Sequence, residues 1–213
     1  MMRMLKLVLI RHGFSKGNEE RRLAGWTDVA LSDVGIDELY QLKKEYEYPE
    51  TEKYYSSDLL RCVQTLQILF GDKRRLDDLL PEFREINFGT LENISQEETI
   101  QRRFFHNWIV GNAIEDEEKY EDFYSRIKAA LYGLAARCVD NCVHSATLVC
   151  HEGVIRIIIL IMKNMGAESF FSIKVPNGLG YELDIIWKEG QMQMVGCQPI
   201  QSKISGDAAK ADR

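Results

Sequence analysis

The chain has 213 residues, of which 45% are hydrophobic and 28% charged, and its formal net charge is −6. A chain of this length and composition can bury a core of its own, which excludes intrinsic disorder and a scaffold stapled by disulfides or metal. The acidic balance argues against nucleic acid and anionic membranes as partners, and no apolar run approaches the ~20 residues that span a bilayer. We expect one domain over residues 1–200 and a polar tail over residues 201–213.

Strand and helix patterns alternate along the first third of the chain. The predicted elements are a strand over residues 5–10, a helix over 32–47, a strand over 53–56 and a helix over 59–70. The first of them leads directly into Arg11 and His12 without a small-residue cleavage site, so it is interpreted as a buried strand and not as a secretion signal. Ser32 is suited to begin the first helix, and Gly71 to end the second.

The same alternation continues after an irregular stretch over residues 81–93. The predicted helices lie around 104–109 and 123–134, with an acidic loop and helix start over 114–122 between them. A strand over 146–150, a helix over 154–165 and two strands over 180–187 and 191–195 follow. Alternating strands and helices indicate an α/β sandwich.

Two of the predicted strands each end in a histidine. His12 is preceded by Arg11 and followed by Gly13, while His151 is followed after one residue by Gly153. Ligands of parallel α/β sheets bind at the carboxyl ends of the strands, so we expect both imidazoles to reach one crevice. The glycines would let the backbone approach a ligand, and the arginine offers a planar fork suited to phosphate. Either histidine alone would more simply be a hydrogen-bonded boundary residue.

The two histidines belong to a longer series of short motifs in a fixed order along the chain. Arg61 and Glu85, members of this series, would each be an ordinary solvated side chain if considered alone. The motifs are Arg11-His12-Gly13, Asn18, Gly25-Trp26-Thr27-Asp28 with Leu31 and Gly35, Ser56-Ser57-Asp58-Leu59-Leu60-Arg61 with Thr65, Glu85 with Phe88-Gly89 and Leu91-Glu92, and His151-Glu152-Gly153 with Arg156. Together they resemble the histidine phosphatase superfamily, also called phosphoglycerate mutase-like. The resemblance implies a three-layer α/β/α sandwich with a mostly parallel central sheet.

The resemblance also implies a set of roles for these residues. His12 would attack phosphorus and become a phosphohistidine, and Glu85 would protonate the leaving oxygen and then deprotonate water. The other implied catalytic residues are Arg11, Arg61 and His151, and the substrate-binding ones are Asn18, Gly13, Gly25 and Gly153. Because arginines and imidazoles would neutralise the transferred phosphoryl group, no metal and no other cofactor is expected.

Three departures from the mutases of this family favour a phosphatase. The interval between Glu85 and His151 is short, Ile86 stands where mutases tend to carry arginine, and Ala24 replaces a hydroxyl residue. The chain instead resembles the short bacterial phosphatases, including α-ribazole phosphatases. Hydrolysis of a small phosphate ester with release of inorganic phosphate is therefore predicted. A cofactor-dependent phosphoglycerate mutase and a non-catalytic phosphate- or phosphoprotein-binding module remain the alternatives.

Residues 95–122 are expected to roof the pocket and to select the substrate. Arg102, Arg103 and His106 are candidates to contact a second anionic group. Phe104, Phe105 and Trp108 would pack an apolar leaving group or, at their helical spacing, the core.

The remaining expectations concern two further arginines, the state of the cysteines, the cellular location and the oligomeric state. Arg126 and Arg156 are assigned to structure and not to catalysis. Five cysteines without a paired motif fit reduced thiols and a cytoplasmic location. We expect a monomer or a homodimer.

Overall fold

The computed structural model describes residues 2–71, 74–101, 103–112 and 116–203. Three predicted features lie wholly or partly outside the described residues. They are the candidate residue Arg102, residues 114 and 115 of the predicted acidic loop, and residues 204–213 of the predicted tail.

A six-stranded sheet with the order β3-β2-β4-β1-β5-β6 forms the centre of the molecule. Its strands are β1 (Met2–Arg11), β2 (Lys53–Ser56), β3 (Asp78–Leu79), β4 (Ser145–Cys150), β5 (Gly180–Lys188) and β6 (Gln191–Pro199). β3, β2, β4 and β1 run parallel to one another, whereas β5 pairs antiparallel with both β1 and β6. The predicted α/β class with a mostly parallel sheet is confirmed.

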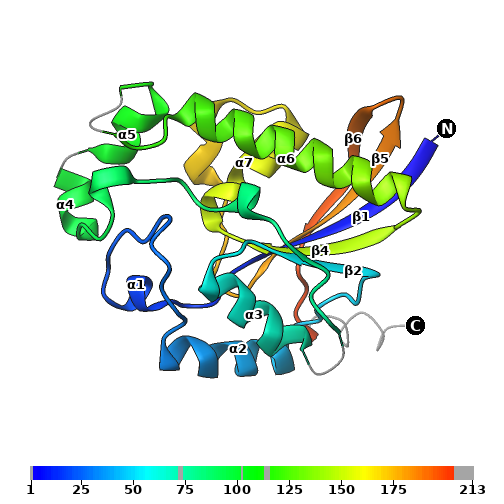
Figure 1. Cartoon of the computed structure of the whole chain (residues 1–213), viewed down its shortest axis with the longest axis horizontal. Helices are drawn as coiled ribbons and strands as arrows, with labels where there is room; N and C mark the ends of the chain where they lie inside the picture. The colour runs from blue at the N-terminus through cyan, green and yellow to red at the C-terminus, as the bar shows by residue number, and fades with distance from the viewer. Residues whose placement is uncertain (1, 72–73, 102, 113–115, 204–213) are drawn as a thin grey trace, which may run out of the picture.

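Long helices cover both faces of this sheet, which gives the three layers (Figure 1). On one face lie α2 (Asp33–Glu45) and α3 (Leu60–Phe70), and on the other lie α6 (Tyr120–Asp140) and α7 (Glu152–Lys163). None of the described helices is long and apolar enough to cross a membrane.

The central strand β1 is apolar on both faces because each face packs against a different helix layer. Leu5, Leu7 and Leu9 belong to the core shared with α6 and α7, whereas Val8 and Ile10 belong to the core shared with α2 and α3. This explains why the strand reads as a continuous apolar run in the sequence.

Short elements surround the end of the sheet where the parallel strands finish (Figure 1). They are α1 (Lys16–Glu19), the 3-10 turns η1 (Pro81–Phe83), η2 (Gly89–Leu91) and η3 (Ala167–Ser172), and the helices α4 (Gln96–Gln101) and α5 (Phe104–Ile109). α1, α4, α5 and η3 supply part of the walls of the cavity at this end.

The predicted elements are confirmed, although α6 extends to Asp140 and β6 to Pro199, well beyond their predicted ends at 134 and 195. The Ser32 hydroxyl accepts a hydrogen bond from the Gly35 amide and begins α2, and Gly71 caps α3. The helix after β4 begins earlier than predicted, directly after His151. β3 and α4 have no counterpart among the predicted elements, since a two-residue strand and a six-residue helix carry almost no periodic signal.

Candidate active site

The two strand-end histidines lie side by side. β1 and β4 pair in parallel with Arg11 opposite Cys150, so the residues that follow, His12 and His151, leave the sheet together. The His12 amide donates to the Cys150 carbonyl over 3.0 Å, and the two imidazole centroids are 5.3 Å apart. Sheet register therefore brings together two residues that are far apart in the chain.

The His12 imidazole is held in one orientation and is neutral. Its Nδ1 lies 2.7 Å from the carbonyl oxygen of Gly13, and a carbonyl can only accept, so Nδ1 carries the proton. Burial lowers the pKa of His12 well below its ordinary value, and the charges of Arg61 and Arg11 lower it further. Nε2 consequently keeps a free lone pair, which is the form that a nucleophile requires.

Arg61 lies in the first turn of α3 and is almost fully buried, with 1% of its surface exposed. Its Nη2 donates to the Gly25 carbonyl over 2.6 Å and its Nη1 to the Thr27 carbonyl over 3.0 Å. These bonds fix the guanidinium at the wall of the cavity that also contains His12.

Arg11 is the last residue of β1 and also lines the cavity. Its Nη1 donates to the Val175 carbonyl over 2.6 Å, and its Nη2 lies 3.0 Å from Oε2 of Glu152. Its Nε is buried and has no hydrogen-bond partner within the described part of the chain. Burial lowers the pKa of Arg11, so this guanidinium would gain from an anion placed against it.

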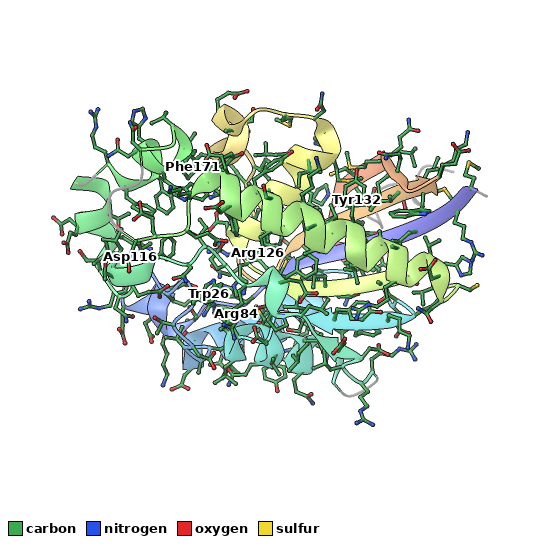
Figure 2. The ribbon with its side chains drawn as sticks, turned by 45° about the horizontal axis from the view of Figure 1, so that its top comes forward. Trp26, Arg84, Asp116, Arg126, Tyr132 and Phe171 are labelled. Atoms are coloured by element: carbon green, nitrogen blue, oxygen red, sulfur yellow. The ribbon has the colours of Figure 1, made fainter. Side chains whose placement is uncertain are left out.

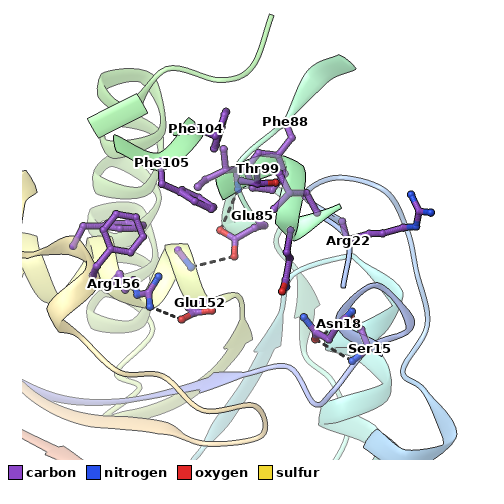
Figure 3. Close-up of a pocket in the computed structure, with 18 of the residues that line it drawn as sticks. Ser15, Asn18, Arg22, Glu85, Phe88, Thr99, Phe104, Phe105, Glu152 and Arg156 are labelled. Atoms are coloured by element: carbon purple, nitrogen blue, oxygen red, sulfur yellow. Dashed lines mark hydrogen bonds and ion pairs between the residues drawn. The ribbon is translucent and has the colours of Figure 1, made fainter. Parts of the chain in front are cut away.

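The Glu85 carboxyl is set to hold a proton. Its Oε2 accepts from the Gly153 amide and its Oε1 from the Ile86 amide, both over 3.1 Å (Figure 3). Burial raises the pKa of Glu85, and the charge of Glu152 raises it further. The hydrogen bonds from the two amides and the charge of Arg61 lower it, but the net effect is a raised pKa. A raised pKa suits a carboxyl group that donates a proton and then takes one back.

The backbone of Glu85 is fixed by an aromatic and cationic stack. The carbonyl of Glu85 accepts from Trp26 Nε1 over 2.8 Å and from Arg126 Nη2 over 3.1 Å. The Trp26 ring lies 5.0 Å from the guanidinium carbon of Arg84 and 5.9 Å from that of Arg126 (Figure 2). Arg126 therefore holds the loop that carries Glu85, which agrees with its assignment to structure.

His151 and Asn18 occupy different depths of the site. His151 is fully buried, does not line the cavity, and has Nε2 2.9 Å from the Ser57 hydroxyl oxygen. Burial lowers the pKa of His151, as do Arg61 and His12. Asn18 does line the cavity, and its Oδ1 accepts from the backbone amide and hydroxyl of Ser15, each over 3.1 Å.

The three glycines expected to approach a ligand differ in their surroundings. Gly25 and Gly153 line the cavity, whereas Gly13 does not. The Gly13 amide donates to the Thr65 hydroxyl over 2.9 Å, and a Cβ at Gly13 would lie 2.6 Å from Cδ1 of Leu39. The structure therefore explains the glycine at position 13 by its packing against Leu39, whereas the sequence suggested that it lets the backbone approach a ligand.

A cavity of about 450 Å³ opens beside His12, within the range of ligand-binding pockets. Part of its wall comes from α4, α5 and Arg103, which directly precedes α5, as expected for residues 95–122. The residues Thr99, Arg103, Phe104, Phe105 and His106 all line it. Trp108 is instead buried in the core and donates to the Glu118 carbonyl over 2.7 Å.

Sequence reasoning missed three charged residues of the cavity, which are Arg22, Glu152 and Arg156. Arg156 was assigned to structure and Glu152 was given no role, yet both line the cavity, and Arg156 Nη2 lies 2.5 Å from Oε1 of Glu152 (Figure 3). The spacing of four residues along one helix was the available signal, because it places both side chains on one face of α7. Phe170 and Phe171, from η3, complete this wall.

The described residues hold no group of three or more His, Cys, Asp or Glu side chains arranged to bind a metal ion.

Comparisons with known proteins agree with this geometry. A family model described as "Histidine phosphatase superfamily (branch 1)" matches residues 7–198. The α-ribazole phosphatase from Shigella flexneri is 21% identical with a TM-score of 0.74 over 89% of this chain and 94% of that one. A phosphoserine phosphatase mutant from Entamoeba histolytica, solved with phosphoserine, is 25% identical with a TM-score of 0.68 over 91% and 96%. A phosphoglycerate mutase from Bacillus anthracis is 20% identical with a TM-score of 0.69 over 94% and 92%.

Proposed function

The chain belongs to the histidine phosphatase superfamily (branch 1), and from this membership we propose that it hydrolyses a small phosphate monoester through a phosphohistidine at His12. The observation that supports this most is the state of His12. A neutral imidazole whose Nδ1 is bonded to a carbonyl leaves Nε2 with a free lone pair, and His12 lines the same cavity as Arg11, Arg61 and Glu85.

In the first step, Nε2 of His12 forms a bond to phosphorus while the bond from phosphorus to the ester oxygen breaks. Glu85 acts in its protonated form, which burial favours by raising its pKa, and gives its proton to that oxygen, so the alcohol leaves neutral. In the second step, Glu85 takes a proton from water, the water oxygen bonds to phosphorus, and the bond between nitrogen and phosphorus breaks. Inorganic phosphate leaves and His12 returns to its neutral form.

The remaining site residues stabilise charge on the transferred group. Negative charge spreads over the three equatorial oxygens in the transition state, and rigid donors lower its energy. Arg11 and Arg61, which both line the cavity, are the cationic donors. Asn18 adds a neutral contact, and His151, behind the cavity wall, supports the packing beside His12. With this charge supplied by side chains, the proposal includes no metal.

The proposal is tested with His12→Gln and a matched control, His144→Gln, which removes an exposed histidine. Brief exposure to a radiolabelled phosphate ester, followed by rapid quenching, is expected to leave an acid-labile, base-stable label on the wild type and on the control. His12→Gln is expected to carry no label and to lose turnover of 4-nitrophenyl phosphate. Full turnover by a folded His12→Gln protein would refute the proposal.

Two further measurements test the metal-free mechanism and separate the proposal from the mutase alternative. Addition of a strong chelator is expected to leave turnover unchanged, and a large loss would contradict the metal-free mechanism. Incubation with 3-phosphoglycerate and a bisphosphoglycerate primer is expected to give no 2-phosphoglycerate, and rapid interconversion would assign the chain to the mutases.

A further inference from the structure

A carboxylate belonging to the protein lies inside the cavity, between two of its cations. Glu152 follows His151 directly and lies in the first turn of α7. Its Oε2 is 3.0 Å from Nη2 of Arg11, and its Oε1 is 2.5 Å from Nη2 of Arg156. Its side chain is 27% exposed, so the negative charge faces the cavity and is only partly screened by solvent.

The protein holds Arg156 through its Nε, through its Nη2 and against two aromatic rings. Besides its bond to Glu152, its Nε donates to the Ile173 carbonyl over 3.1 Å. Its guanidinium carbon lies 5.3 Å from the centroid of the Phe170 ring and 5.4 Å from that of Phe171. A substrate carboxylate that bound Nη2 of Arg156 would have to displace Glu152. Any carboxylate beside the phosphoryl group would also meet the charge of Glu152 at short range in a cavity where charges are weakly screened.

Aromatic rings form the wall on the same side. In the view of Figure 3, Phe104 and Phe105 lie on the side of Glu85 away from Ser15 and Asn18. The Phe105 centroid is 5.0 Å from that of Phe104 and 5.5 Å from that of Phe171. Phe171 is 46% exposed, which leaves part of its ring free to contact a ligand. Apolar rings of this kind favour an apolar or aromatic group against them.

We propose that Glu152 determines specificity: with the phenylalanine wall, it makes the cavity select phosphate monoesters with an uncharged, apolar leaving group and reject those with a carboxylate next to the ester. This inference rests on the proposed phosphatase function and names the substrate class of that same site. The rejection applies to a carboxylate close enough to the ester to compete for Arg156.

Turnover of three alkyl esters tests the inference: benzyl phosphate, propyl phosphate and phosphoglycolate. The last two are similar in size and differ in the carboxylate, so their ratio of kcat/KM isolates the effect of charge. The wild type is expected to prefer benzyl over propyl phosphate, and propyl phosphate over phosphoglycolate. In Glu152→Gln, the ratio for phosphoglycolate over propyl phosphate is expected to rise about tenfold or more, which corresponds to about 1.4 kcal/mol. The loss of the contact with Arg11 lowers turnover of both esters and cancels in the ratio.

Glu38→Gln is the matched control, since it removes the same charge from the exposed face of α2. It is expected to leave every ratio at the wild-type value. An unchanged ratio in Glu152→Gln, or wild-type turnover of phosphoglycolate equal to that of propyl phosphate, would overturn the inference.

Binding of non-hydrolysable phosphonates separates this inference from the proposed function. By calorimetry, the wild type is expected to bind propylphosphonate more tightly than 3-phosphonopropionate, and Glu152→Gln to narrow that difference. If these affinities follow expectation while no ester is turned over, the phosphatase proposal fails and the selectivity stands. If esters are turned over but the affinities and ratios do not respond to Glu152, the selectivity fails and the phosphatase proposal stands.

Discussion

Replacement of Glu85 by glutamine keeps the shape of the side chain and removes the proton that we assign to the leaving group. In the wild type, both carboxyl oxygens accept from amides, those of Gly153 and Ile86, each over 3.1 Å. Glutamine offers one oxygen and one NH2 group, so one of these amides loses its acceptor. We expect this to lower the free energy of unfolding by about 1–3 kcal/mol, which leaves the protein folded if its stability is typical.

The effect on catalysis depends on the leaving group. An alkoxide is a poor leaving group, so kcat/KM for benzyl phosphate is expected to fall about 10²- to 10⁴-fold without a general acid. The 4-nitrophenolate ion leaves without a proton, so kcat/KM for 4-nitrophenyl phosphate is expected to fall less than about tenfold, or about 1.4 kcal/mol of transition-state stabilisation. Because the same residue activates water, the phosphohistidine should accumulate, and stopped-flow traces should show a burst of 4-nitrophenolate before a slow phase.

The pH dependence gives a second readout with a defined sign. Glu85 acts in its protonated form in the first step, so wild-type kcat/KM for benzyl phosphate is expected to fall as pH rises through the raised pKa of this carboxyl. Glu85→Gln should lack this fall. Glu82→Gln, an exposed change of the same kind three residues earlier, is the control. Equal losses for the two esters in Glu85→Gln would refute the assignment of Glu85 as general acid.

Three further predictions concern the scaffold around this residue. Arg61→Lys keeps a positive charge but cannot reach both carbonyls that Arg61 contacts, so kcat/KM is expected to fall about 10²- to 10³-fold. The circular dichroism spectrum of this variant should remain native. A fall in kcat/KM below about tenfold would contradict the role of Arg61 as a cationic donor. Burial holds the pKa of both site histidines below 6.5, so in acid the unfolded chain binds protons that the folded chain does not. Urea titrations should therefore show the free energy of unfolding decreasing as pH falls below about 6.5, by up to about 1.4 kcal/mol per pH unit for each histidine, and an increase would refute this. Gly180→Ala places a Cβ against the Leu9 carbonyl of the neighbouring strand and should lower the free energy of unfolding by about 1–3 kcal/mol. The control, Gly133→Ala, places its Cβ in open space on α6 and should not lower it. Equal stabilities of the two variants would contradict the contact.

The fold could be predicted because its signals are local and strong. β1 and β4 are buried on both faces, so they read as continuous apolar runs, and Ser32 and Gly71 mark helix ends by their own chemistry. Strands that end in histidine also predicted where the site would form, since the carboxyl ends of parallel strands meet at one edge.

The parts that the sequence did not predict depend on packing between distant segments. The place of Arg156 follows from the contact of α7 with η3, where Phe170 and Phe171 flank its guanidinium, and no local pattern encodes that contact. Likewise, the sequence around Gly13 does not show why a glycine is required there. A glycine that lets a ligand approach and a glycine that avoids a clash between a Cβ and Leu39 look the same in the sequence.

The position of β1 in the sheet has a consequence for how the protein acquires its activity. β1 opens the chain, yet both of its neighbours, β4 and β5, come from the last third of the sequence. The pairing that sets His12 beside His151 therefore closes a loop of more than half the chain, and contacts of such large sequence separation form slowly during folding. Recovery of turnover after denaturation should consequently lag behind the recovery of helical signal, which makes the active site itself a reporter of the last stage of folding.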